Sequence, residues 1–130
     1  KQPAHNVSLG ADGLFAFGRS GLMDLQPTGR VRLSELAMQI KTGFSKVRQV
    51  TVNGYTDRIG NAADNMKLSQ ARAETVKQFL VSEGVPASLI QTVGRGASEP
   101  VVNCPGPKSP SVIACLAPNR RIVVSVNGDK

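Results

Sequence analysis

The longest amphipathic pattern in the chain lies between two strand-like runs, and it constrains the fold more than any other feature. In residues 61–83 an apolar stripe recurs with helical spacing at Leu68, Ala71, Thr75/Val76, Phe79 and Leu80. Gly84 and Pro86 end this helix. Before it, residues 47–55 alternate between two faces, and after it residues 90–94 form a short run with strand character. The pattern predicts a strand-helix-strand unit.

A second helix and two further strands complete the predicted order. Residues 24–43 predict a helix, with Pro27 in its first turn and apolar residues at three- and four-residue spacing. The glycine-interrupted run at residues 7–17 predicts short strands or one strand with a bulge. A proline-rich loop reaches residue 118, and residues 121–126 form the last strand. Strands alternating with helices of this length favour a sheet with helices packed on one face.

Composition indicates one domain, expected to span residues 1–130 with a core at about 7–127. The chain has 130 residues, of which 40% are apolar and 19% charged, as in ordinary globular domains. The net charge of +7 raises nucleic acid as a partner. However, the sixteen basic residues are scattered, and Arg120 and Arg121 are the only adjacent pair. We therefore interpret the charge as a solvated basic surface and expect no nucleic-acid partner.

Two cysteines, Cys104 and Cys115, flank the proline-rich stretch before the last strand. An even number at close spacing fits one disulfide that closes this loop in an oxidising compartment. Two free thiols in a reducing compartment are the alternative. No metal site is expected, because His5 is the only histidine and two cysteines eleven residues apart lack the further ligands that zinc needs.

The sequence offers little for a catalytic centre. A Ser-His-Asp triad needs a histidine, and His5 lies in the polar N-terminal stretch. Asp57 and Asp64 could form a carboxylate pair, but carboxylates at a strand-helix junction are more commonly solvated or capping. Residues 54–60 contain too few glycines for a phosphate-binding loop. We therefore expect that the protein is not an enzyme.

The best candidates for a binding site lie on the long helix and just before it. Asn65, Leu68 and Arg72 are spaced i, i+3 and i+7, so they project from one side of the helix. An arginine on this apolar side must stay near water or find a carboxylate, and Asp57 is the obvious partner. Two interpretations follow: an internal Asp57–Arg72 salt bridge, or a site for a zwitterion with an ammonium and a carboxylate. Clefts at the carboxyl ends of strands favour the second.

Five sequence elements, in order, resemble the OmpA-like peptidoglycan-binding domain. They are Gly54-Tyr55-Thr56-Asp57-x-x-Gly60, Asn65-x-x-Leu68-Ser69-x-x-Arg72-Ala73-x-x-Val76-x-x-x-Leu80, Gly84-Val85, Gly94-x-Gly96-x-x-x-Pro100 and Asn119-Arg120-Arg121. The resemblance covers roughly residues 14–126. Cys104 and Cys115, followed by residues 116–121, are most similar to the periplasmic C-terminal domain of OmpA-type outer membrane proteins. The resemblance implies an α/β (α+β) fold of βαβαβ type, with a mixed sheet, two main helices on one face and a disulfide-closed loop before the last strand.

The resemblance also implies a function and a set of site residues. The family binds the diaminopimelate residue in the peptide stem of peptidoglycan non-covalently, which anchors the outer membrane to the cell wall without a cofactor. By motif, Asp57 would receive the diaminopimelate ammonium and Arg72 its carboxylate. Further contacts would come from Thr56, Asn65, Leu68, Arg120 and Arg121, the two arginines bordering the cleft. Near Gly18, where the family often has a polar residue, this chain has Phe17-Gly18-Arg19, so that contact is not carried over.

The resemblance implies a parent protein as well. We expect a periplasmic domain of an outer membrane protein whose N-terminal β-barrel is absent from this sequence; lipoproteins and flagellar stator proteins are alternative parents. Peptidoglycan is the expected partner, and a homodimer is left open. The alternative function is a structural or oligomerising periplasmic domain with an internal Asp57–Arg72 salt bridge and no ligand.

Overall fold

The computed structural model describes residues 5–130. Its strands and α-helices follow in the order β1 (His5–Gly10), α1 (Ala11–Leu14), α2 (Pro27–Thr42), β2 (Lys46–Tyr55), α3 (Ala62–Ser82), β3 (Ile90–Gly94), α4 (Pro110–Cys115) and β4 (Arg121–Asp129). Short 3₁₀ turns occur at η1 (Leu22–Asp24), η2 (Ala87–Leu89) and η3 (Ala117–Asn119).

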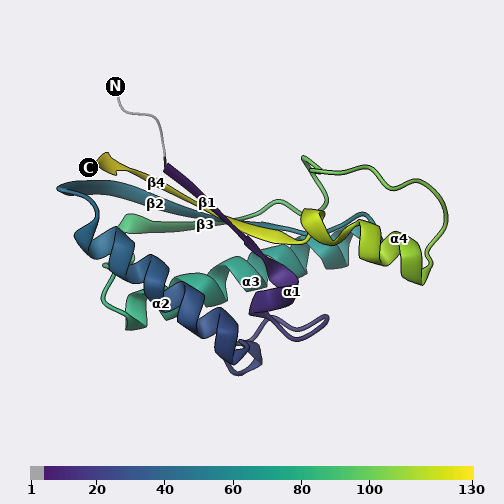
Figure 1. Ribbon diagram of the computed structural model, residues 1–130, viewed down its shortest axis with the longest axis horizontal. Coiled ribbons are helices and arrows are strands. Elements are labelled where there is room, and N and C mark those ends of the chain that lie inside the picture. Colours follow the sequence, from purple (N-terminus) through teal and green to yellow (C-terminus); the bar gives the residue numbers. More distant parts are fainter. Residues whose placement is uncertain (1–4) are drawn as a thin grey trace.

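The strands form one mixed sheet in the order β1-β4-β2-β3. The last strand, β4, lies antiparallel between β1 and β2, whereas β2 and β3 are parallel and joined through α3. Both α2 and α3 cover the same face of the sheet (Figure 1). The predicted fold class, a mixed sheet with two main helices on one face, is therefore confirmed.

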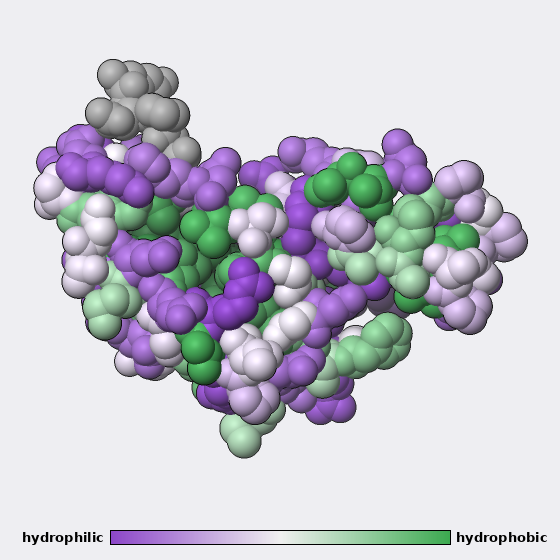
Figure 2. Space-filling model, in the orientation of Figure 1, coloured by the Kyte–Doolittle hydropathy of each residue, from purple (hydrophilic) through white to green (hydrophobic). Residues whose placement is uncertain are grey.

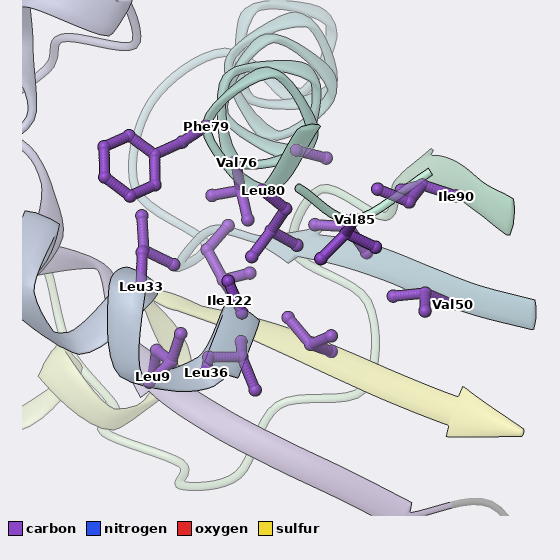
Figure 3. Close-up of a cluster of buried hydrophobic side chains, with 14 of the residues drawn as sticks. Leu9, Leu33, Leu36, Val50, Val76, Phe79, Leu80, Val85, Ile90 and Ile122 are labelled. Atoms are coloured by element: carbon purple, nitrogen blue, oxygen red, sulfur yellow. The ribbon is translucent and has the colours of Figure 1, made fainter. Parts of the chain in front are cut away.

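The core lies between this sheet face and the two helices. Leu33 and Leu36 of α2 and Val76 and Leu80 of α3 point toward Ile122 of β4 (Figure 3), and each is at most 4% exposed. Burying aliphatic side chains of this size stabilises a fold by about 1.5–3 kcal/mol each. The apolar stripe predicted from the sequence is thus the packing face of α3.

Both main helices begin with signals that the sequence carries. Pro27 occupies the first turn of α2, where its missing N–H removes no helical hydrogen bond. The side chain of Asn61 caps α3 by accepting a hydrogen bond from the Asp64 amide over 3.0 Å. Gly84 follows α3 with φ +103°, a conformation that favours glycine and lets the chain leave the helix.

Two segments differ from the sequence predictions. Residues 7–17 contain the end of β1 and the single helical turn α1, whose Ala11 and Leu14 are buried, rather than a second strand. One turn is too short for its periodicity to stand out. The proline-rich loop contains α4, which Ser109 caps by accepting a hydrogen bond from the Val112 amide over 3.2 Å. Pro110 in its first turn is a helix-start signal that the interpretation as a loop overlooked.

The two ends of the sheet differ. At one end, Tyr55 pairs with Arg121, and Gly54 with Gly94. The segment at residues 101–119, here called the disulfide lobe, extends beyond this end (Figure 1). At the other end, His5 pairs with Val126 and Lys46 with Asp129.

Among residues 5–130, no helix has the length and apolar character needed to cross a membrane.

Candidate functional site

A cavity of ≈ 250 Å³ opens at the end of the sheet where β2 finishes and β4 begins. Its walls come from the turn around α1, the β2–α3 loop, α3, the disulfide lobe and the start of β4. The predicted site residues that line it are Thr56, Asp57, Asn65, Leu68, Arg72 and Arg120. The structure therefore brings together residues that are far apart in the sequence.

Arg72 projects from α3 into this cavity with only part of its guanidinium satisfied. The residue is 5% exposed, and its Nε donates to the backbone carbonyl of Arg19 over 2.8 Å. Its Cζ lies 5.1 Å from the centre of the Phe15 ring, a cation–π contact that helps to fix the guanidinium. Among residues 5–130 neither terminal nitrogen has a hydrogen bond or an ion pair. These nitrogens remain available to an anion in the cavity.

Asp57 is paired with Arg120, not with Arg72. Its Oδ2 accepts from Arg120 Nη1 over 2.7 Å, while its Oδ1 accepts from the backbone amide of Ile59 over 3.0 Å. The Asp57–Arg72 salt bridge, which the sequence left open as an alternative, is absent from residues 5–130. Because β4 is inserted beside β2, it brings Arg120 to the end of β2, where Asp57 lies.

Arg120 also binds a second carboxylate. Its Nη2 donates to Asp12 Oδ2 over 3.0 Å, so one guanidinium joins the turn at α1 to the β2–α3 loop. The hydrogen bond to Asp12 raises the pKa of Arg120, with a smaller contribution from Asp57 and partial opposition from burial. For Arg72, burial lowers the pKa, partly offset by the charge of Asp12. The charge of Arg120 is thus balanced by two carboxylates of the protein, whereas Arg72 has no carboxylate partner among residues 5–130.

The polar residues of the β2–α3 loop hold its backbone in place. Asn65 Nδ2 donates to the carbonyls of Asp57 and Ile59 over 3.3 and 3.0 Å, respectively. Thr56 is buried, and its hydroxyl donates to the Asp57 carbonyl over 2.9 Å. Asn65 lines the cavity, and its Oδ1 accepts no hydrogen bond from residues 5–130, so it remains available as an acceptor. Leu68, one turn beyond Asn65 on α3, supplies an apolar part of the wall.

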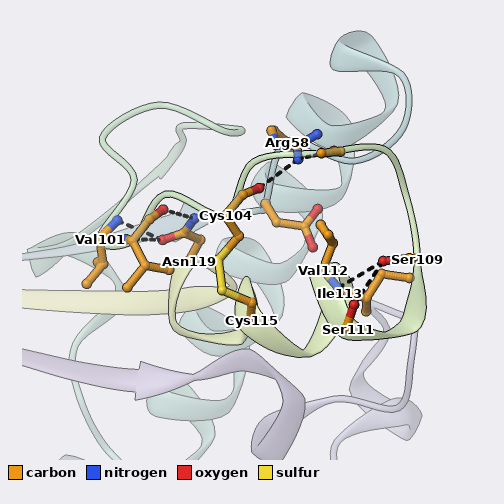
Figure 4. Close-up of a disulfide and its surroundings, with 12 residues drawn as sticks. Arg58, Val101, Cys104, Ser109, Ser111, Val112, Ile113, Cys115 and Asn119 are labelled. Carbon is orange, nitrogen blue, oxygen red and sulfur yellow. Dashed lines mark hydrogen bonds between the residues drawn. A yellow bond between two sulfur atoms is a disulfide. The ribbon is translucent and has the colours of Figure 1, made fainter.

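The disulfide lobe forms another wall; bonds within the lobe close it, and Arg58 holds it to the β2–α3 loop (Figure 4). Cys104 and Cys115 form a disulfide, which confirms that prediction. Arg58 Nη2 donates to the carbonyls of Cys104 and Gly106 over 2.8 and 2.7 Å. The buried amide of Asn119 accepts from the Val101 and Val102 amides over 2.7 and 2.9 Å and donates back to the Val102 carbonyl.

The chain is similar to known proteins in both sequence and fold. The family model described as "OmpA family" matches residues 14–112. The chain belongs to the OmpA family. It is 43% identical over 126 residues to outer membrane protein A of Shimwellia blattae, which covers 95% of this chain and 51% of that protein. The chain spans between about a third and about half the length of the curated relatives it matches.

Two solved structures of OmpA-like architecture are also similar. The cell wall anchor of the type VI secretion system from Pseudomonas aeruginosa is 27% identical, with a TM-score of 0.76 over 98% of this chain and 83% of that one. The peptidoglycan-associated lipoprotein of Burkholderia pseudomallei is 26% identical, with a TM-score of 0.69 over 92% and 89%. The relatives are outer membrane proteins, which confirms the expected location: a periplasmic domain of an outer membrane protein.

In this OmpA-family domain the paired arginines of the Asn119-Arg120-Arg121 element lie in different places. Arg121 is outside the cavity lining: its Cζ stacks 3.8 Å from the centre of the Tyr55 ring. It also donates to the carbonyls of Asn119 and Glu99 over 3.2 and 2.9 Å. Of the two, Arg120 is the one that borders the cavity.

Sequence reasoning missed part of the lining of the OmpA-family cavity, which also contains Asp12, Phe17, Ile59, Gly60, Lys108 and Ile113. Phe17 is 91% exposed, beside Gly18 at the position for which no polar contact was expected. An aromatic residue directly before a glycine was the only signal that the sequence offered for it. In the structure this glycine, Gly18, has φ +67°. Lys108 and Ile113 come from the disulfide lobe, whose surface, at the right in Figure 2, mixes hydrophobic and polar residues.

Proposed function

We propose that this OmpA-family domain binds the diaminopimelate-containing stem peptide of peptidoglycan non-covalently and so anchors an outer membrane protein to the cell wall. Two similar structures carry the names cell wall anchor and peptidoglycan-associated lipoprotein, which supports a cell-wall ligand. The observation that carries the proposal is the pair of unbonded Arg72 terminal nitrogens in a cavity that also contains the Asp57 carboxylate. Diaminopimelate in a stem peptide presents one free amino-acid centre, with an ammonium and a carboxylate.

Arg72 is the group that would bind the ligand carboxylate. Its planar guanidinium can grip a carboxylate through two parallel hydrogen bonds. The Nε of Arg72 is already hydrogen-bonded to the Arg19 carbonyl, and its guanidinium lies over the Phe15 ring. The two terminal nitrogens are therefore oriented before the ligand arrives. A buried, fixed donor loses little entropy on binding, and its charge is screened less than on an open surface.

Asp57 is the group that would receive the ligand ammonium. Each of its oxygens accepts one hydrogen bond in the protein, from Ile59 N and from Arg120 Nη1. A carboxylate oxygen can accept two, so both oxygens have capacity for a further donor. Asn65 Oδ1 offers a second acceptor, while Leu68 contacts the aliphatic part of the ligand side chain. The site would thus recognise a ligand whose ammonium and carboxylate are separated by the distance between Asp57 and Arg72.

Affinity for a single stem is expected to be modest. Each charge-assisted hydrogen bond contributes about 1.5–3 kcal/mol when its partner is in place. Retention at the wall would come from the many repeated stems, which give a high effective concentration around a tethered domain. An anchor of this kind needs no covalent bond and no catalytic group.

The alternative, a structural domain with no ligand, rested on an Asp57–Arg72 bridge that would fill the cavity. Arg120 takes the place of Arg72 as the partner of Asp57, and the space beside Arg72 stays open. This observation favours the ligand over the alternative.

Calorimetric titration with a diaminopimelate-containing muropeptide tests the proposal. Arg72→Ala and Asp57→Ala should each weaken binding at least about tenfold, the loss expected for one charge-assisted contact. Arg32→Ala, which removes an exposed charge on α2, serves as the matched control and should bind normally. An analogue with lysine in place of diaminopimelate lacks the second carboxylate and should bind more weakly. Unchanged binding in either site variant, with unchanged circular dichroism, would contradict the proposal.

A further inference from the structure

The charges that line the cavity do not balance. Its cationic residues are Arg72, Lys108 and Arg120, and its acidic residues are Asp12 and Asp57. Three positive charges against two negative ones leave a net charge of +1. A zwitterion adds no net charge, so the imbalance would persist after such a ligand is bound.

The distribution of the ion pairs shows where the excess lies. Both acids are bound to the single guanidinium of Arg120. Arg72 and Lys108 belong to none of the ion pairs found among residues 5–130. One ligand carboxylate can satisfy Arg72, and Lys108 is then the cation left over. Lys108 is exposed and hydrated without a counterion, so a ligand carboxylate placed beside it would gain an ion pair.

We propose that Lys108 binds a second carboxylate of the same ligand, so that the domain selects peptides with an acidic group beside the amino-acid centre held by Arg72 and Asp57. This inference rests on the proposed function, and it adds that the preferred ligand carries a net negative charge. The second carboxylate can come from the residue next to diaminopimelate or from the carboxyl terminus of the peptide, because both present the same chemistry to an ammonium group.

The backbone around Lys108 is well held, which suits a ligand contact. Arg58 donates to the carbonyl of Gly106, two residues before Lys108. Ser109, the next residue, caps α4 through the Val112 amide. The Cys104–Cys115 disulfide closes the segment. A long, exposed side chain on a fixed backbone can reach a carboxylate at the cavity mouth while remaining hydrated.

The test crosses two variants with three peptides. The variants are Lys108→Gln and Lys67→Gln; the second removes an exposed lysine of α3 that is outside the cavity lining and so controls for net charge. The peptides have both carboxylates free, an amide at the neighbouring residue, or an amide at the carboxyl terminus. Lys108→Gln should weaken binding of the free peptide by about three- to fivefold, as expected for an exposed ion pair. It should have no effect on the one peptide whose amide replaces the carboxylate that Lys108 binds.

Each other result counts against the inference. An equal loss with all three peptides, or an equal loss in Lys67→Gln, would mean that Lys108 acts only through long-range charge. No loss with any peptide would mean that Lys108 makes no contact. Arg72→Ala, measured in parallel, separates the two proposals. If Arg72→Ala weakens binding while Lys108→Gln does not, the proposed function stands and only the contact between Lys108 and a second carboxylate is wrong. Failure of the unaltered chain to bind any of the peptides overturns both.

Discussion

Arg120 donates from Nη1 to Asp57 Oδ2 over 2.7 Å, and the two residues are 63 positions apart in the sequence. The same side chain reaches Asp12 at the turn of α1. One guanidinium therefore fixes two carboxylates from different parts of the chain at the edge of the cavity. This relationship makes Arg120 a positioning residue for Asp57 and a link between three segments of the fold.

The link predicts a stability cost when Arg120 is replaced. Arg120→Gln should lower the free energy of unfolding by about 1.5–3 kcal/mol, since the largely buried Asp57 loses its charge-assisted hydrogen bond. Arg48→Gln breaks a pair with Asp129 that is far more exposed, so its effect should be much smaller. Urea unfolding of both variants measures the difference. Equal effects would show that the Arg120 bonds do not stabilise the domain.

Phe17 should matter for binding but not for folding. It is 91% exposed yet lines the cavity, so it contributes little to the core and can contact a ligand. Phe17→Ala should weaken muropeptide binding by about fivefold, equivalent to roughly 1 kcal/mol for an aromatic contact. The melting temperature should be unchanged.

Met23→Ala is the control for this prediction. Met23 lies in the same connection between α1 and α2 and is 89% exposed, but it is outside the cavity lining. Its truncation should leave both binding and melting temperature unaltered. A similar loss of affinity in the two variants would assign the effect of Phe17 to general loop packing.

The disulfide should support both the fold and the cavity wall. Replacing Cys104 and Cys115 by serine together should lower the free energy of unfolding by about 3 kcal/mol, the value expected for a loop of this length. Binding should also weaken, because Lys108 and Ile113 lie between the two cysteines. A reductant should reproduce both effects in the unaltered chain and do nothing further to the variant. An unaltered affinity after reduction would show that the lobe keeps its place without the bond.

Helix α3 lies so close to β2 that a side chain at Gly54 would collide with the backbone oxygen of Ser69. Gly54→Ala should therefore destabilise the domain by about 1–3 kcal/mol or more, the usual cost of overpacking. Gly10→Ala is the matched control, because a Cβ at this exposed position meets nothing within 4 Å. Thermal unfolding distinguishes the two, and equal melting temperatures would mean that α3 can shift away from the sheet at little cost.

Features of the site that depend on local spacing could be predicted from the sequence, whereas those that depend on contacts between distant segments could not. The spacing of Asn65, Leu68 and Arg72 is local, so the sequence correctly placed all three on one side of a helix, and the structure puts them in one cavity. The partner of Asp57 depends on which strand lies beside β2, a non-local choice that propensity does not encode. For the same reason, neither Asp12 nor Lys108 could be assigned to the site from local patterns.

Burial on the second face of β2 shows the same limit. Residues 47–55 alternate as a strand with one exposed face would, yet Asn53 is 6% and Tyr55 8% exposed. Arg95 covers Asn53 through a hydrogen bond from Nε to Oδ1 over 3.0 Å, and Arg121 covers Tyr55. Long cationic side chains from elsewhere in the sequence bury these positions, and alternation along one strand does not reveal such cover.

The placement of the cavity at one end of the sheet, with His5 and Asp129 at the other, has a mechanical consequence. Tension between a ligand held by Arg72 and a segment joined near His5 or Asp129 would act along the strands. The ladder hydrogen bonds of β1, β4 and β2 would then be loaded in shear and resist together, instead of being peeled apart one at a time. A domain arranged in this way can carry a sustained pull through bonds that are individually weak.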